Sequence, residues 1–182
     1  MSQRDEIKRI ESKMDLFELT DTLGMYSYKY ERSHFIDYFI NYLELGANDT
    51  FFDLGSGYGE VLIPFAKRFK LASFIGIEIV KSRFAYSVKL SEQMLLQNVL
   101  FRNEDLIKSN LTSGNYFYLF NPLFDFQYPS LISKLKEVSA QKEITIISEA
   151  KSSLYFDAVD WLDETHRVRK NFLVNAKVYK SK

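Results

Sequence analysis

The chain of 182 residues contains no cysteine, two histidines, three prolines and seven glycines. The absence of cysteine excludes disulfide frameworks, thiolate metal sites and cysteine nucleophiles. His34 and His166 are too few for the usual zinc site, so no metal site is expected. No apolar run approaches the roughly 18 residues that a membrane-spanning helix needs. Basic and acidic side chains number 24 each, which argues against a strongly basic nucleic-acid module but permits a local basic patch.

The remaining composition is typical of a folded protein, because 46% of the residues are hydrophobic. The length suits one domain, since domains usually hold about 100–200 residues. The first thirteen residues are charged throughout and do not have the pattern of a signal peptide. These features predict one cytoplasmic domain over residues 1–182, in which a helical N-terminal cap (1–46) packs on a core (47–182).

The spacing of apolar residues predicts helices that alternate with short, continuously apolar strands. We expect helices at 4–18, 34–45, 58–69, 81–96, 129–138 and 153–164. We expect strands at 50–54, 74–79, 98–101, 115–120 and 143–148, and two antiparallel strands near 166–173 and 175–180. Pro64 should kink or shorten the third helix. This pattern predicts an α/β fold with a central, mostly parallel seven-stranded sheet, helices on both faces and a C-terminal antiparallel hairpin.

Three of the seven glycines lie within five residues, in the segment Asp53-Leu54-Gly55-Ser56-Gly57-Tyr58-Gly59. The cluster follows a predicted strand and opens a predicted helix, and ligands of open α/β sheets bind beyond the carboxyl ends of the strands. Glycine lets such a loop turn sharply and lets its backbone touch a ligand. A purely structural tight turn is the alternative, but the preceding acid and the strand–helix context favour a cofactor site.

The spacing of the glycines separates several classes of cofactor. A dinucleotide site needs G-x-G-x-x-G, whereas here Gly59 comes one place early and Glu60 stands where the third glycine belongs. A P-loop is excluded because no Gly-Lys-Ser/Thr follows. The pattern D-x-G-x-G-x-G resembles motif I of the class I S-adenosylmethionine-dependent methyltransferases. The resemblance implies a Rossmann-like fold and S-adenosyl-L-methionine as cofactor. Its expected contacts in this loop are Asp53, Gly55, Ser56, Gly57, Tyr58 and Gly59.

Two further acids follow in the order that this family implies. Glu78 ends the next predicted strand, 19 residues after Gly59, at the place where an acid accepts hydrogen bonds from two ribose hydroxyls. Asp105 follows the third strand, at a position that in the family often caps the adenine amino group. Its neighbour Glu104 is a competitor, and Asp105 also suits the N-cap of a helix. We expect Glu78 and Asp105 to bind the cofactor.

The segment Asn121-Pro122-Leu123-Phe124 ends the fourth predicted strand, where the family places acceptor-site residues. Together with D-L-G-S-G-Y-G-E-V and G-I-E-I, it is similar to the histone lysine methyltransferases that lack the SET fold. Asn121 matches the first asparagine of their motif, Phe124 and Phe126 match its aromatic residues, and Pro122 departs from it. The same tetrapeptide resembles the [DNS]-P-P-[YF] motif of amino-methylating nucleic-acid and glutamine methyltransferases, from which Leu123 departs.

The resemblance implies that Asn121, Pro122 and Phe124 are catalytic and that Asn121 also contacts the cofactor. Methyl transfer from a sulfonium depends mainly on alignment. We expect the side-chain carbonyl of Asn121 to hold an acceptor N–H group and Phe124 to stack on a planar acceptor. A lysine acceptor is harder to use, because its usual pKa of about 10.4 has to fall to about 7. An aromatic channel could cause this by desolvation, with Tyr26, Tyr28 and Tyr30 as its wall or lid.

The leading expectation is therefore methyl transfer to a nitrogen of a protein side chain, with lysine favoured and a protein as partner. The alternatives are a nucleic-acid base amine or a small molecule as acceptor, and a non-catalytic cofactor-binding scaffold protein. One charge feature bears on the partner, because residues 167–182 hold six basic side chains and no acidic one. We expect a solvated strand edge there, with a contact for RNA as the alternative.

Overall fold

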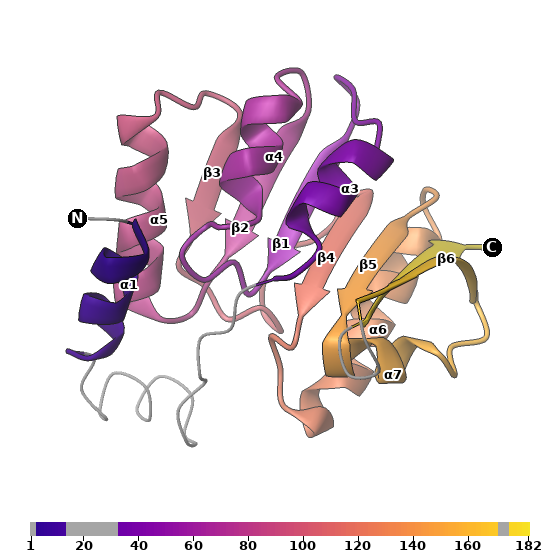
Figure 1. Cartoon of the computed structure of the whole chain (residues 1–182). Coiled ribbons are helices and arrows are strands. Elements are labelled where there is room, and N and C mark those ends of the chain that lie inside the picture. Colours follow the sequence, from indigo (N-terminus) through magenta and orange to yellow (C-terminus); the bar gives the residue numbers. More distant parts are fainter. Residues whose placement is uncertain (1–2, 14–32, 171–174) are drawn as a thin grey trace.

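The computed structural model describes residues 3–13, 33–170 and 175–182 of the chain. It confirms the predicted α/β fold, with a seven-stranded sheet in the order β3-β2-β1-β4-β5-β7-β6 (Figure 1). The strands are β1 (Thr50–Leu54), β2 (Ser73–Ile77), β3 (Val99–Arg102), β4 (Tyr116–Phe120), β5 (Thr145–Glu149), β6 (Leu162–Arg169) and β7 (Asn175–Ser181). Strands β1 to β5 are parallel, and β7 pairs antiparallel with both β5 and β6.

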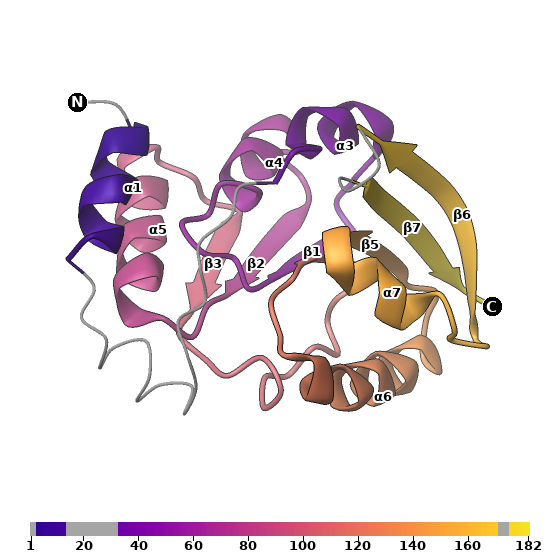
Figure 2. The ribbon, with the colours of Figure 1, turned by 60° about the horizontal axis from the view of Figure 1, so that its bottom comes forward.

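Helices cover both faces of this sheet (Figure 2). They are α1 (Gln3–Glu11), α3 (Ile36–Tyr42), α4 (Leu62–Arg68), α5 (Lys81–Gln93), α6 (Tyr128–Ser139) and α7 (Ser153–Phe156), with 3-10 turns η1 (Asp125–Gln127) and η2 (Ala150–Ser152). Helices α3, α4 and α5 pack on one face, and α6 and α7 pack on the other. Helix α1 lies against α5, at the β3 side of the molecule. Among the described residues, no helix has the length and apolar character needed to cross a membrane.

The central strand shows why the apolar runs form this sheet. Successive residues of a strand point to opposite faces, and Phe51 and Phe52 are both fully buried. Phe51 packs on Phe65 of α4, with ring centroids 4.9 Å apart, and Phe52 packs on Phe117 at 5.7 Å. Burying each such side chain contributes about 1.5–3 kcal/mol. A continuous apolar run therefore stabilises a strand that has helices above and below it.

The helix predicted at 58–69 begins later, at Leu62. Pro64 then stands in the first turn of α4, where its missing N–H group costs no hydrogen bond of the helix. The helix predicted at 4–18 is present as α1, which ends at Glu11. Its residues 14–18 lie outside the described residues, as does most of the tyrosine-rich segment with Tyr26, Tyr28 and Tyr30.

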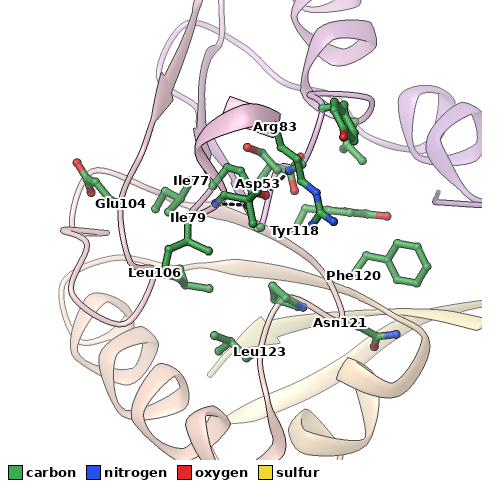
Figure 3. Close-up of a pocket in the computed structure, with 18 of the residues that line it drawn as sticks. Asp53, Ile77, Ile79, Arg83, Glu104, Leu106, Tyr118, Phe120, Asn121 and Leu123 are labelled. Atoms are coloured by element: carbon green, nitrogen blue, oxygen red, sulfur yellow. Dashed lines mark hydrogen bonds between the residues drawn. The ribbon is translucent and has the colours of Figure 1, made fainter. Parts of the chain in front are cut away.

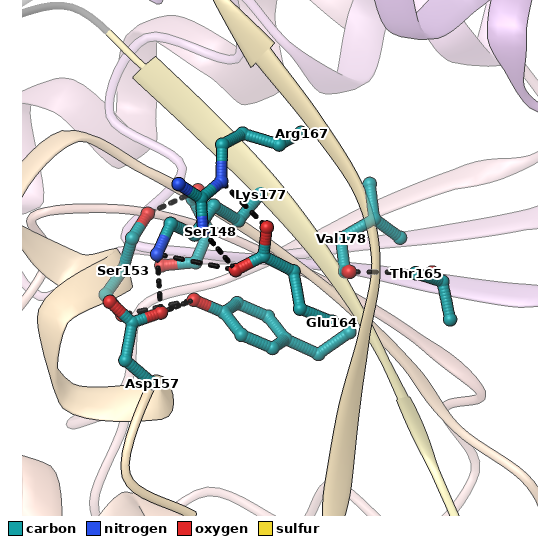
Figure 4. Close-up of polar contacts among 9 residues, drawn as sticks. Ser148, Ser153, Asp157, Glu164, Thr165, Arg167, Lys177 and Val178 are labelled. Carbon is teal, nitrogen blue, oxygen red and sulfur yellow. Dashed lines mark hydrogen bonds and ion pairs between the residues drawn. The ribbon is translucent and has the colours of Figure 1, made fainter.

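The helix predicted at 153–164 is wrong beyond its first turn. Helix α7 ends at Phe156, and β6 already begins at Leu162, which is buried at 7% exposure. The acidic residues Asp157 and Glu164, which fall within the predicted helix, instead meet a cation of the hairpin, as Figure 4 shows. Lys177 Nζ lies 2.5 Å from Asp157 and 3.3 Å from Glu164. Cross-strand ion pairs and the burial of Leu162 therefore favour a strand over a longer helix.

Most of the six basic side chains in residues 167–182, the basic tail, also form ion pairs. Four of its six cations form ion pairs with acidic side chains, and these are Arg167, Lys177, Lys180 and Lys182. This pattern favours the interpretation of the tail as a charged strand edge.

Candidate active site

The carboxyl ends of β1, β2 and β4 open into a cavity of about 460 Å³. Figure 3 shows Asp53 and Arg83 on one side of it and Asn121 and Leu123 on the other. The cavity brings together nearly all of the site residues expected from the sequence. Those that line it are Asp53, Gly55, Ser56, Gly57, Tyr58, Glu78, Asp105, Asn121, Pro122 and Phe124. The described part of the chain contains no group of three metal-ligating side chains of the His, Asp or Glu type.

Gly59 is the expected site residue that does not line the cavity. Its φ is +75°, and a Cβ atom placed on it would lie 2.9 Å from the ring of Phe101 and 3.2 Å from Ser87 Cβ. The third glycine of the cluster therefore allows the segment before α4 to pack closely against β3 and α5. Gly59 therefore has a packing role and does not face the cavity.

Four backbone N–H groups of the glycine loop donate hydrogen bonds within the protein. Gly55 and Ser56 both donate to the carbonyl oxygen of Ile77 at 2.9 Å, and Gly59 donates to that of Ser56 at 2.8 Å. Gly57 donates to Glu78 Oε2 at 2.8 Å. A phosphate group would need these donors. These four donors are therefore not available to an anion.

Two carboxyl groups lie at the base of the cavity. Glu78 is 6% exposed, and its Oε1 accepts a hydrogen bond from Val80 N–H at 2.8 Å. Burial raises the pKa of Glu78, while its backbone hydrogen bonds and the charge of Arg83 act in the opposite direction. Asp53 is 3% exposed, and its carboxyl group receives no hydrogen bond from any described residue. Burial, and then repulsion from Glu78, raise the pKa of Asp53 to about 8.

The hydroxyl group of Ser56 is, like the carboxyl group of Asp53, a polar group without a hydrogen-bond partner among the described residues. Ser56 Oγ is buried and forms no hydrogen bond with the described residues. Buried polar groups are normally hydrogen-bonded, and each exception needs an explanation. Together with Asp53, this hydroxyl leaves hydrogen-bonding groups at the cavity that suit a ligand with N–H groups.

Asp105 lines the cavity and also stabilises its own turn. Its Oδ1 accepts a hydrogen bond from Ile107 N–H at 2.9 Å, and its Oδ2 lies 3.5 Å from Lys108 Nζ. Glu104, the competing acid, lines the same cavity. Asp105 thus has the turn-stabilising contact of the structural alternative and the location expected of a cofactor contact.

The acceptor segment has an unusual backbone. Asn121 has a φ of +47°, and its backbone N–H donates to Ser152 Oγ at 2.7 Å. Its Oδ1 accepts from Ser152 N–H at 3.0 Å and from Ser152 Oγ at 3.2 Å. The side-chain carbonyl that we expected to hold an acceptor N–H group therefore faces Ser152. The Nδ2 group is the part of this side chain that has no hydrogen bond to the described residues.

Two phenylalanines follow this segment. The rings of Phe124 and Phe126 are parallel within 4°, and their centroids are 6.0 Å apart. Phe124 lines the cavity, whereas Phe126 is 66% exposed. An exposed ring that continues a stack from the cavity wall offers a planar surface to an incoming acceptor.

Several residues at the cavity were missed from the sequence. Arg83 is 5% exposed and forms a two-bond ion pair with Glu11 of α1. Its position five residues after Glu78 was the only available signal. Tyr118 donates a hydrogen bond to the fully buried carboxylate of Glu149, which also accepts from Ser33 Oγ at 2.7 Å. Burial and Glu149 raise the pKa of Tyr118.

Comparisons with known proteins agree with this arrangement. The family model described as "Histone methylation protein DOT1" matches residues 25–103. A tRNA (guanine-N(7)-)-methyltransferase of Oceanobacillus iheyensis is 37% identical over 60 residues, which are 33% of this chain. That match spans only 28% of the relative's length.

Two solved structures cover most of the chain. An RNA methyltransferase from Salinibacter ruber, in complex with S-adenosyl-L-homocysteine, has a TM-score of 0.59 and 21% identity over 84% of this chain and 92% of its own. A SAM dependent methyltransferase from Aquifex aeolicus has a TM-score of 0.64 and 14% identity over 96% and 98%. With the strand order β3-β2-β1-β4-β5-β7-β6, these matches show that the chain has the Rossmann-like fold of the class I S-adenosylmethionine-dependent methyltransferases.

Proposed function

We propose that this chain is an S-adenosylmethionine-dependent methyltransferase and that its acceptor is a nitrogen atom of a nucleic-acid base. The observation that carries the cofactor assignment is the buried, unpartnered carboxyl group of Asp53 beside Glu78 at the glycine loop. When bound, the cofactor supplies a methyl group on a positively charged sulfonium, which an acceptor takes by direct displacement.

The residues of the cavity fit this cofactor. Asp53 and Ser56 Oγ are acceptors for the ammonium group of its methionine part, and Glu78 is an acceptor for ribose hydroxyls. The loop N–H groups are engaged by Ile77 and Glu78, which disfavours a pyrophosphate in the same place.

The acceptor assignment depends on Asn121, Phe124 and Phe126. The parallel rings of the two phenylalanines suit stacking on a planar base. The Nδ2 group of Asn121 can donate to a carbonyl oxygen or ring nitrogen of that base and so orient it. Alignment of the acceptor nitrogen with the methyl group is the main contribution of the protein to such a reaction. The relative of 37% identity is named for methylation of tRNA at a guanine nitrogen, which is compatible with this acceptor class.

A protein side chain, lysine above all, is the second candidate. It is supported by the family-model match over residues 25–103, which includes the glycine loop and Glu78. That match ends before Asn121, so it supports the cofactor half of the site more than the choice of acceptor.

Incubation with methyl-labelled S-adenosylmethionine and fractionated cell extract tests the proposal. We expect label that nuclease removes and protease leaves, and we expect Asp53→Asn to abolish it. Label removed by protease instead would establish the protein acceptor. If S-adenosylhomocysteine binds in calorimetry but no fraction is labelled, the chain is a cofactor-binding scaffold. If S-adenosylhomocysteine does not bind, the cofactor assignment itself is wrong.

A further inference from the structure

We propose that Arg169 and Lys170, at the end of the hairpin strand β6, bind the phosphate backbone of a single-stranded nucleic acid while one of its bases occupies the cavity. The inference rests on the proposed function, because it assigns a second contact to the nucleic-acid acceptor. We call Arg169 and Lys170 the basic edge. It differs from the cavity in its target, which is the backbone and not the base.

The basic edge consists of the two cations of the basic tail that have no acidic partner within residues 3–13, 33–170 and 175–182. The other four cations of the tail form ion pairs, and these are Arg167, Lys177, Lys180 and Lys182. Arg169 and Lys170 are both exposed. Their charges are therefore available to an anion that arrives from solution.

The register of the sheet places the basic edge on the side at which the cavity opens. Val168 of β6 pairs with Ala176 of β7, and Ala176 pairs in turn with Glu149 of β5. Glu149 pairs with Phe120 of β4, which lines the cavity. Neighbouring strands lie about 4.8 Å apart, so three strand spacings separate Val168 from Phe120 by roughly 14 Å. Because β6 runs parallel to β5, Arg169 lies one residue further toward the carboxyl ends of the parallel strands.

The acidic residue at the end of β5 does not face a strand bound at this surface. Glu149 is fully buried, and its Oε2 accepts hydrogen bonds from the hydroxyl groups of Tyr118 and of Ser33, the latter at 2.7 Å. Its Oε1 accepts from the backbone N–H of His34 at 2.9 Å. Three donors thus surround this carboxylate inside the protein, whereas the cations of the basic edge are exposed.

A phosphate backbone fits a pair of cations at this distance from the cavity, because its charges repeat along the strand on both sides of any base. Arginine and lysine contact phosphate oxygens and so position a nucleic acid without reading its sequence. The parallel rings of Phe124 and Phe126 offer the complementary contact, a planar surface for a base. The chain has no net charge, so its attraction for a polyanion depends on local groups such as the basic edge.

Fluorescence anisotropy with a fluorescein-labelled single-stranded RNA of mixed sequence measures this contact. In the double variant Arg169→Gln with Lys170→Gln, we expect the Kd at about 50 mM salt to rise by about tenfold. The slope of log K against log salt should fall by about 1.4, which is about 0.7 for each of two phosphate contacts. The matched control is Lys67→Gln with Lys70→Gln. These lysines are also exposed and have no acidic partner among the described residues, but they lie between α4 and β2, at the opposite edge of the sheet.

The control removes the same charge, so its Kd for RNA should stay within about twofold of the wild-type value. Equal effects of the two double variants would mean that only net charge matters, and the inference would be wrong. It would also be wrong if the wild-type protein did not bind the RNA. Calorimetry with S-adenosylhomocysteine separates these results from the proposed function. Both double variants should bind it with the wild-type Kd, because neither pair lines the cavity. A wild-type protein that does not bind S-adenosylhomocysteine would overturn the proposed function itself.

Discussion

A Cβ atom placed on Gly55 would lie 2.6 Å from the Cβ atom of Pro122, so the first glycine of the loop touches the segment expected to receive the acceptor. This contact joins the loop after β1 to the loop after β4, the two neighbouring strands at the centre of the sheet. Glycine is therefore needed at position 55 for two reasons. A side chain would collide with Pro122, and the φ of +87° disfavours any residue that has a side chain. The absence of a side chain at Gly55 therefore allows the loop after β1 to approach the loop after β4 closely.

Gly55→Ala should therefore weaken both folding and binding. The left-handed backbone alone costs roughly 1–2 kcal/mol for alanine, and the contact with Pro122 adds to it. Urea unfolding should show a fall in the free energy of unfolding of about that size, with weaker S-adenosylhomocysteine binding. Gly46→Ala is the control, because the nearest atom to its Cβ position is 3.9 Å away. Equal effects at the two glycines would contradict this account.

Asp53 predicts how stability depends on pH. Its pKa is raised to about 8 in the folded protein, whereas an unfolded aspartate titrates near 3.9. Between these values the folded state binds the extra proton, so the free energy of unfolding falls as pH rises, by at most about 1.4 kcal/mol per pH unit. Stability from this group is complete below pH 4 and is lost by about pH 8. Asp53→Asn should flatten the dependence, and Asp160→Asn, at an exposed position, should not.

The sequence allowed the fold to be predicted because the signals were local. Buried strands such as Tyr116–Phe120 are continuous runs of apolar and aromatic residues, and the glycine cluster after the strand Thr50–Leu54 marks the binding edge of the sheet. The wrong helix at 153–164 had a different cause. The spacing of Asp157 and Glu164 in the sequence is that of two residues on one face of a helix. Only the tertiary structure brings Lys177, more than ten residues further along the chain, into contact with both.

Contacts between residues far apart in the sequence also limited the prediction of the residues around the cavity. Gly59 belongs to the motif by spacing, yet its neighbour Phe101 is more than forty residues away and gives it a packing role. Glu11 and Arg83 are 72 residues apart and meet only because α1 lies against α5. Motif spacing identifies residues that share a loop, whereas contacts between distant elements require the tertiary structure.

Tyr118→Phe should destabilise the protein, because it removes a hydrogen-bond donor from the carboxylate of Glu149. The fully buried Glu149 carboxylate would lose a hydroxyl donor and keep those of Ser33 and His34. A buried charged group that loses a hydrogen bond costs about 1–3 kcal/mol, measurable by urea unfolding. Tyr116→Phe, on the same strand but without a hydrogen bond to its hydroxyl among the described residues, should cost much less. Similar losses in the two variants would mean that Glu149 does not need this donor.

Phe126→Ala tests the acceptor surface separately from the cofactor site. Phe126 is 66% exposed, so its removal should change neither the melting temperature nor the Kd for S-adenosylhomocysteine. Stacking on a base is worth about 1–3 kcal/mol, so kcat/KM for a nucleic-acid acceptor should fall by roughly five- to a hundredfold. Leu71→Ala removes an apolar side chain elsewhere that is even more exposed, at 74%, and should leave kcat/KM unchanged. Unchanged transfer by Phe126→Ala, with binding of the cofactor product intact, would remove the argument for a stacked planar acceptor and favour the protein side chain.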